Sequence, residues 1–148
     1  MENIWTKIND NIPGYMQKIN KQYNMTCIKI SPLKTAMIGE GFALIIAIDR
    51  FDANVSYVYK VKDEFIVLLC DNYFAEKYDT DDRKDLLSED GAETSVINNL
   101  IVISNGLISK WNNVLSGENE WIADYKKSRW YAVGKMTPDE MRIIEKYI

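Results

Sequence analysis

The spacing of apolar residues divides the chain into a helical beginning, a β-rich middle and a helical end. From Ile4 to Tyr23, apolar residues recur at steps of three and four, which predicts a helix with one apolar face. Pro13-Gly14 interrupts this pattern, so we expect either a kink or two short helices that meet there. The apolar stripe is then the face that packs on the rest of the protein.

The middle of the chain changes to the period of two that is typical of strands. Short turn signals such as Gly39-Glu40-Gly41 separate the runs, and no helix-length insert lies between them, which predicts an antiparallel meander. The run 42–48 is apolar on both faces, as in a central strand covered on both sides or one whose second face binds a partner. The run 55–61 alternates and predicts a half-exposed strand. The five expected strands are 25–31, 33–38, 42–49, 55–61 and 65–70.

Helical spacing returns after residue 70. We expect a short helix at 74–78, an acidic helix start at 79–82, a long amphipathic helix over 94–116 ended by Gly117, and a short helix around 121–125. Gly106 within the long helix indicates a close approach or a weak point. Residues 128–133 are ambiguous and could be extended. Thr137-Pro138-Asp139-Glu140 is a capping box that begins a last helix, whose expected buried face is Met141, Ile144, Tyr147 and Ile148.

These elements predict the fold class. We expect an α+β protein with an antiparallel meander sheet of four to five strands, flanked by an N-terminal helical segment and several C-terminal helices, in a single globular domain over 1–148. The composition, with 47% hydrophobic and 27% charged residues, is ordinary for a globular protein. Trp111 lies on the apolar face of the long helix and is expected to anchor the core.

Features of targeting and redox chemistry point to the cytoplasm. The N-terminus lacks the basic and apolar regions of a signal peptide, and the longest apolar run, 42–48, is too short to cross a bilayer. We therefore expect a cytoplasmic protein without a membrane partner. Cys27 and Cys70 lie in apolar, strand-like sequence and are expected to be reduced, buried thiols, although the sequence leaves a disulfide open.

The chain contains no His, which excludes imidazole-based nucleophile activation and the commonest metal ligand. Ser31-Pro32-Leu33-Lys34 matches the spacing of a Ser-Lys nucleophile motif, but it follows strand-like sequence and lacks the companion motifs. No glycine-rich phosphate loop is present. We therefore expect no cofactor, no metal and no enzymatic activity.

Carboxylates at strand ends keep one enzymatic alternative open, a small carboxylate-dependent enzyme with or without a metal. Asp49, Asp52, Asp63 and Asp71 all fall at strand boundaries, where Asp also forms turns. In a meander, successive boundaries alternate between the ends of the sheet. We expect Asp49 and Asp52 at one end, Asp63 at the other and Asp71 near the first pair, so that no catalytic cluster forms.

The strongest charge feature lies at 76–93, which carries a net charge of −5 in a chain of net charge −4. A calcium loop counted from Asp79 would place Lys84 where the turn needs Gly, which argues against it. The segment is then either a solvated helix start or a surface that attracts a basic partner. The candidate partner-binding residues, expected to be exposed, are Asp79, Asp81, Asp82, Asp85, Glu89 and Asp90.

A second cluster combines aromatic and basic residues between Trp121 and Tyr131. Such a cluster can bind single-stranded nucleic acid, but an isoelectric point near 4.9 opposes phosphate binding. Aromatic and Arg residues are also common in protein interfaces. We therefore expect no nucleic-acid partner.

The type of protein is suggested by residues 65–131. This stretch includes Phe65-Ile66-Val67-Leu68-Leu69, the run from Asp71 to Tyr78, and Ser109-Lys110-Trp111-Asn112-Asn113-Val114-Leu115. As a small acidic α+β domain, the chain resembles the immunity proteins of bacterial polymorphic-toxin systems. The resemblance implies a protein–protein interface that neutralises a cognate toxin, with a basic, nuclease-like toxin as the suited partner. A subunit that self-associates through an apolar sheet face is a further alternative.

Overall fold

The sheet of the computed structural model, which describes residues 3–148, contains six antiparallel strands in the order of the chain. Each strand pairs with the next, so the predicted meander is confirmed. The prediction of four to five strands missed the last strand, which has two residues and is too short to show a period. The strands are β1 (Thr26–Ser31), β2 (Lys34–Ile38), β3 (Phe42–Ile48), β4 (Ala53–Val61), β5 (Glu64–Leu68) and β6 (Val133–Gly134).

Helices account for most of the remaining chain. The N-terminal segment folds as three short helices, and the predicted break at Pro13-Gly14 falls in the second. The helix expected over 94–116 is two helices, because the backbone of Trp111 leaves helical geometry between them. The helices are α1 (Ile4–Asp10), α2 (Ile12–Tyr15), α3 (Gln17–Tyr23), α4 (Asp71–Ala75), α5 (Ala92–Lys110), α6 (Asn112–Leu115), α7 (Trp121–Lys127) and α8 (Pro138–Ile144).

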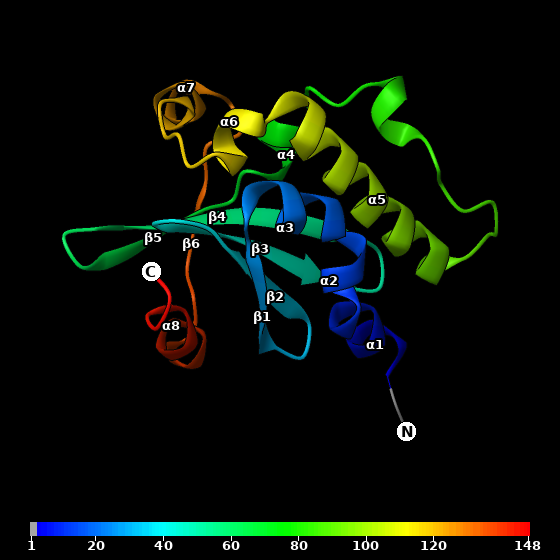
Figure 1. The fold of residues 1–148 in the computed structure, drawn as a ribbon, viewed down its shortest axis with the longest axis horizontal. Helices are drawn as coiled ribbons and strands as arrows, with labels where there is room; N and C mark the ends of the chain where they lie inside the picture. The colour runs from blue at the N-terminus through cyan, green and yellow to red at the C-terminus, as the bar shows by residue number, and fades with distance from the viewer. Residues whose placement is uncertain (1–2) are drawn as a thin grey trace.

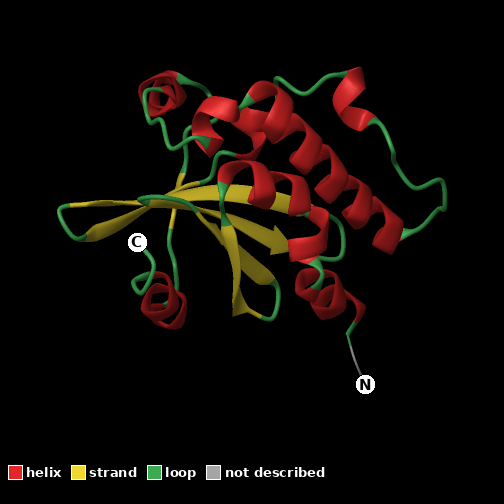
Figure 2. Ribbon diagram, viewed as in Figure 1, coloured by secondary structure: helices red, strands yellow, loops and turns green. Residues whose placement is uncertain are grey.

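Helices lie on both faces of the sheet (Figures 1 and 2), and the apolar layer on one face is larger than that on the other. On one face, residues of β3 such as Leu44 and Ile46 pack with apolar residues of helices α1 to α7. On the other face, Ala43 and Ile45 of the same strand pack with Ile144 of α8. The prediction that β3 is covered on both sides is therefore confirmed. The prediction that β4 is half exposed is wrong for its first part, because every residue from Ala53 to Val58 except Asn54 is buried.

Helix α8 begins as predicted, with Pro138 in its first turn and a capping box between Thr137 and Glu140. Glu140 also contacts Lys34 of β2, with a distance of 3.0 Å between Oε2 and Nζ. This ion pair fixes α8 on the sheet. Of the expected buried face, Ile144 is fully buried, whereas Tyr147 is exposed.

Trp111 is the core anchor that its helical position predicts. Only 2% of its surface is exposed, and its indole Nε1 donates a hydrogen bond to the Phe74 carbonyl at 3.0 Å. The predicted close approach at Gly106 is also confirmed, since an added Cβ would lie 2.2 Å from the ring of Tyr78. Both cysteines are free; Cys70 is buried and Cys27 is half-buried. Within residues 3–148, no helix has the length and apolar character needed to cross a lipid bilayer.

Candidate functional site

The chain between α4 and α5 carries most of the acidic residues singled out by the sequence. We call residues 79–91 the acidic segment. It begins with a single 3₁₀ turn, η1 (Thr80–Arg83), in place of the predicted longer helix. Asp79 accepts hydrogen bonds from the backbone N–H groups of Asp81 and Asp82, and Asp82 accepts one from the N–H of Asp79. This reciprocal capping uses two of the six candidate carboxylates to shape the backbone.

Asp82 corrects the expectation that all six carboxylates are exposed, because only 2% of its surface is accessible. Its Oδ2 lies 3.0 Å from Nζ of Lys110, and its Oδ1 accepts a hydrogen bond from the Ser109 hydroxyl. Lys110 also lies 2.9 Å from Asp79. Burial by itself would raise the pKa of Asp82, but these hydrogen bonds and the Lys110 charge hold that pKa below its ordinary value.

Ser109, Lys110 and Asp82 bring a hydroxyl, an amine and a carboxylate together, with 3.2 Å between Lys110 Nζ and Ser109 Oγ. A Ser-Lys nucleophile pair needs a neutral amine to accept the hydroxyl proton. Here hydrogen bonds to Asp79 and Asp82 raise the pKa of Lys110 and keep it charged. The cluster therefore holds η1 against α5, and Lys110 is not available as the base of a Ser-Lys pair.

Two asparagines of α5 hold the backbone of the acidic segment, one at η1 and one in its irregular part. Asn98 accepts a hydrogen bond from the Leu87 N–H at 2.8 Å and donates one to the Leu87 carbonyl at 3.1 Å. Asn105 donates a hydrogen bond to the Asp82 carbonyl at 3.0 Å. Asn98 thus gives Leu87 the hydrogen bonds that a strand or helix would provide, within a stretch, 84–91, that has no regular secondary structure.

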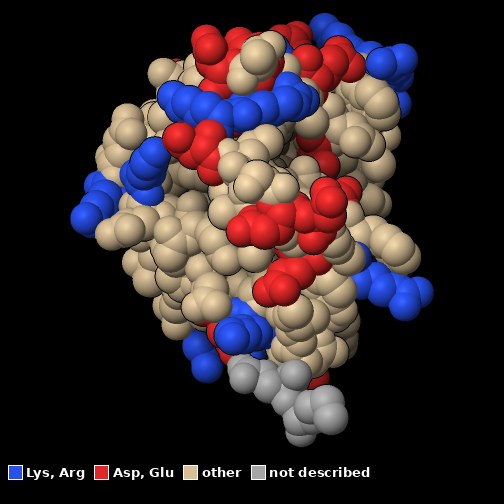
Figure 3. Space-filling model, turned by 90° about the vertical axis from the view of Figure 1, so that its right-hand side faces the viewer, with Lys and Arg blue, Asp and Glu red and all other residues tan. Residues whose placement is uncertain are grey.

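The other four candidate carboxylates, Asp81, Asp85, Glu89 and Asp90, are exposed. None of them forms an ion pair with another residue of the described chain, 3–148. Leu86 and Leu87 lie between them in sequence and are 38% and 43% exposed. Figure 3 shows acidic side chains gathered in the middle of the face that carries this segment, with basic side chains above them. The segment therefore offers uncompensated negative charge beside apolar surface.

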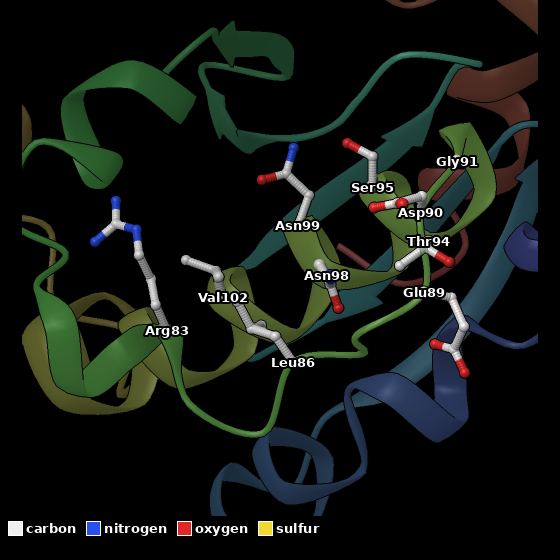
Figure 4. A pocket seen from close by; sticks show the side chains of 10 residues that line it. All are labelled: Arg83, Leu86, Glu89, Asp90, Gly91, Thr94, Ser95, Asn98, Asn99 and Val102. Carbon is white, nitrogen blue, oxygen red and sulfur yellow. The ribbon is translucent and has the colours of Figure 1, made fainter.

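A groove of about 470 Å³ separates the acidic segment from α5. Arg83 lies at one end, Leu86 and Val102 lie in the middle, and Glu89 and Asp90 lie at the other end (Figure 4). The floor near the acidic end is polar and comes from α5, with Thr94, Ser95, Asn98 and Asn99. The groove can accept an extended segment of a partner that presents a basic group toward Glu89 and Asp90.

The sequence pattern does not single out Asn98, Asn105 or Ser109 as residues that contact the acidic segment. They lie seven and four positions apart, which places them on one side of α5. The sequence shows these residues as a polar stripe on an otherwise apolar helix. Such a stripe does not by itself show that it contacts the acidic segment.

The strand-end carboxylates are placed as the meander predicts. Asp49 and Asp52 form the β3–β4 turn, where Asp49 accepts hydrogen bonds from the N–H groups of Phe51 and Asp52. Asp63 lies in the β4–β5 turn at the opposite end of the sheet. Asp71 returns to the first end, where it accepts a hydrogen bond from the Val55 N–H. Two of the four, Asp52 and Asp71, line the same hollow, fewer than the three that a catalytic cluster requires.

The aromatic and basic cluster near the C-terminus is divided between core and surface. Trp121 and Tyr125 are buried, with 4% and 0% of their surface exposed. Trp130 is half-buried, and its Nε1 donates to a Glu76 carboxylate oxygen at 2.6 Å while Arg129 lies over its ring. An acidic residue therefore takes part in this cluster, which disfavours the binding of a phosphate backbone there.

Within residues 3–148, no group of three or more Cys, Asp or Glu side chains is arranged to hold a metal ion. Comparisons of the chain with protein-family models, curated proteins and solved structures found no significant match.

Proposed function

We propose that this protein is a cytoplasmic immunity-type protein that binds and neutralises a cognate bacterial toxin through the acidic segment. The observation that carries the proposal is the contrast within that segment. Asn98 and Asn105 of α5 hold its backbone at Leu87 and Asp82, while Asp81, Asp85, Glu89 and Asp90 remain exposed and unpaired. A fixed segment loses little conformational freedom when it binds, so that more of the interaction energy appears as affinity.

The charge of the segment indicates the chemistry of the partner. Four exposed carboxylates attract a basic surface and raise the rate of association, especially at low ionic strength. The exposed Leu86 and Leu87 would supply apolar contact within a polar rim, which is the usual composition of a protein interface. A basic, nuclease-like toxin fits this surface, because a nuclease needs positive charge to bind phosphate. Asp79 and Asp82 then contribute by shaping η1.

The two alternatives receive less support from the geometry. A carboxylate-dependent enzyme requires several convergent carboxylates, and only Asp52 and Asp71 share a hollow. A subunit that dimerises through an apolar sheet face requires that face to be open, but Ala43 and Val58 on that face are fully buried within the chain.

The experiment begins with co-expression of the tagged protein and the product of the neighbouring gene, followed by purification of the complex. Association is then measured by stopped flow over a range of salt concentrations. The variant Asp81→Lys with Asp85→Lys should lower the association rate about tenfold or more at low salt and flatten its salt dependence. Its stability should change by less than about 0.5 kcal/mol, because both side chains are exposed.

A matched control makes the same change of charge far from the acidic segment. Glu118 and Glu145 are exposed and lie near α7 and at the end of α8, on the other side of the molecule (Figure 1). Glu118→Lys with Glu145→Lys should leave the association rate within about twofold. Equal effects of the two double variants would show that only total charge matters, and the proposed surface would then be wrong.

A further inference from the structure

The sheet has two edges, and only one of them is long enough to pair with a further strand. Strand β1 has six residues and β6 has two, and each has a single strand neighbour within the described chain. An open edge presents unpaired N–H and C=O groups, which proteins cover, bend or use for association. The register of the sheet determines which groups β1 presents.

Hydrogen bonds at both ends of the β2–β3 pair fix the direction of the backbone groups in β2. The Gly39 N–H donates to the Phe42 carbonyl, and the Ile48 N–H donates to the Leu33 carbonyl. Hydrogen-bonded pairs alternate along an antiparallel ladder. The odd-numbered residues of β2 therefore bond to β3, and its even-numbered residues direct their N–H and C=O groups toward β1.

Cys27 and Lys29 consequently direct their backbone groups away from the sheet. Ile28, between them, pairs with the even-numbered Ala36 and uses its own N–H and C=O groups within the chain. Outside the strand ladder, no hydrogen bond within residues 3–148 involves the backbone groups of Cys27 or Lys29. All three side chains keep some exposed surface, so the edge is accessible.

We propose that the edge of β1 pairs with the same edge of a second copy, about a two-fold axis that passes through Ile28. In this antiparallel register, Cys27 of each copy lies opposite Lys29 of the other, and each such pair exchanges both of its N–H···O hydrogen bonds. This association uses the edge of the sheet and leaves its covered faces unchanged. Because β1 is not part of the acidic segment, the proposal does not rest on the proposed function.

The side chains of the edge favour a second copy in this register. Ile28 belongs to the face that α8 covers, and it would meet Ile28 of the second copy on the same face, so that the apolar layer continues across the pair. Lys29 would meet Cys27, whereas a shift of two residues would bring the two Lys29 side chains opposite each other. The Lys29 ammonium also lies 2.8 Å from Asp10, which offsets repulsion between the copies.

The paired edge is short, which determines the strength of the association. The register of β1 with β2 shifts between Lys29 and Ser31, and such an irregularity bends the strand away from a straight edge. The regular pairing is therefore confined to the residues around Ile28. An interface of this size is at the weak, reversible end of the range, so we expect a dimer with a dissociation constant on the order of 0.1 mM.

Single cysteines test the register. In a Cys27→Ser background, Ile28→Cys should form a disulfide between two copies on mild oxidation, because opposite residues of a non-hydrogen-bonded pair have Cα atoms about 4.5 Å apart. Non-reducing electrophoresis then shows a band at twice the 17.2 kDa mass of the chain. Thr26→Cys is the matched control on the same face: it would lie opposite Ile30 and should cross-link at least about tenfold more slowly. Cys70 is fully buried and does not interfere.

A proline tests the backbone hydrogen bonds. Lys29→Pro removes an N–H that points away from the sheet and leaves the bonds between β1 and β2 intact, as proline on an edge strand does. It should weaken dimerisation about tenfold or more in sedimentation equilibrium at protein concentrations up to about 1 mM. Lys29→Ala, which keeps the N–H, should stay within about threefold of the unmodified protein. Thermal unfolding of each variant confirms that it is folded.

The same measurements can overturn the proposal. It is wrong if the unmodified protein is still monomeric at about 1 mM, if Thr26→Cys cross-links as fast as Ile28→Cys, or if Lys29→Pro dimerises as tightly as Lys29→Ala. Faster cross-linking of Lys29→Cys in the same background would show the shifted register instead. If the protein is monomeric and Lys29→Pro weakens binding of the toxin, the edge pairs with a strand of that partner and not with a second copy.

Discussion

Asp71 and Asp82 are both carboxylates that the fold removes from bulk water, yet their pKa values move in opposite directions. Burial is the largest influence on each and would raise both. At Asp82, the Ser109 hydroxyl, the Asp79 N–H and the Lys110 charge outweigh burial, and the pKa is lowered. At Asp71, one backbone N–H acts against burial and against the charge of Asp52, and the pKa rises to about 6.

This difference separates a carboxylate that stabilises the fold from one that the fold leaves electrostatically unsatisfied. The Asp82 region, at the start of the acidic segment, contains its own cation. The Asp71 region, at the end of the sheet, has none within the described residues. A buried charge without a partner costs stability, and proteins often retain such costs where a ligand binds. Asp82 therefore stabilises the fold, whereas the charge of Asp71 lowers its stability at neutral pH.

The largest change in the free energy of unfolding is expected from a substitution in the core that supports both regions. Trp111 lies between α4, which carries Asp71, and α5, which anchors Asp82, and it hydrogen-bonds to Phe74. Trp111→Ala should lower the free energy of unfolding by about 3–5 kcal/mol, as truncation of a large core aromatic residue does. Urea unfolding followed by circular dichroism measures this. A loss below about 1 kcal/mol would show that the two regions do not share this support.

An intermediate change is expected from substitution of Asp71, and it should raise the free energy of unfolding. Its pKa in the folded state, about 6, exceeds its ordinary value of 3.8, so its contribution to stability is full below about pH 4 and is lost as the pH rises through about 6. Asp71→Asn removes the charge and keeps an oxygen for the Val55 N–H. It should therefore stabilise the protein at neutral pH by about 1–3 kcal/mol.

The measurement for Asp71 is the unfolding free energy from about pH 4 to pH 8. The profile of Asp71→Asn should lose the decrease that the unmodified protein shows across this range. Asp63→Asn, in the exposed β4–β5 turn, serves as the control and should keep the decrease. If the decrease persists in Asp71→Asn, another group is responsible and the comparison with Asp82 fails.

The smallest expected effect is at Asp82. Its lowered pKa contributes stability that is present above the ordinary value of about 3.8 and is lost as the pH falls through the folded value. Asp82→Asn should destabilise the protein by about 1–2 kcal/mol at neutral pH, because the charge-assisted bonds to Ser109 and Lys110 are lost. Asp81→Asn on the same turn is exposed and should change stability by less than about 0.5 kcal/mol. Stabilisation by Asp82→Asn would remove the contrast between the two regions.

The sequence by itself determined the elements whose causes are local. Alternating residues and short turns predicted β1 to β5, and Thr137 to Glu140 predicted the start of α8, because side-chain direction and capping depend on neighbours a few residues away. The helical position of Trp111 predicted its burial for the same reason. The strand-end carboxylates could also be placed, because a meander fixes which end of the sheet each turn occupies.

Only the tertiary structure decided what each carboxylate does. Asp82 is buried because Ser109 and Lys110, far along the chain, lie beside η1, and no spacing rule connects residues separated by a whole helix. The division of the long helix at Trp111 and the pairing of β6 likewise depend on contacts with α4 and β5. Asp71 has a raised pKa because it is partly buried beside the first residues of β4, which extend past the end of β5, and no Lys or Arg lines the space around it. Desolvation and ion pairing depend on distances in space, and these exist only once the chain has folded.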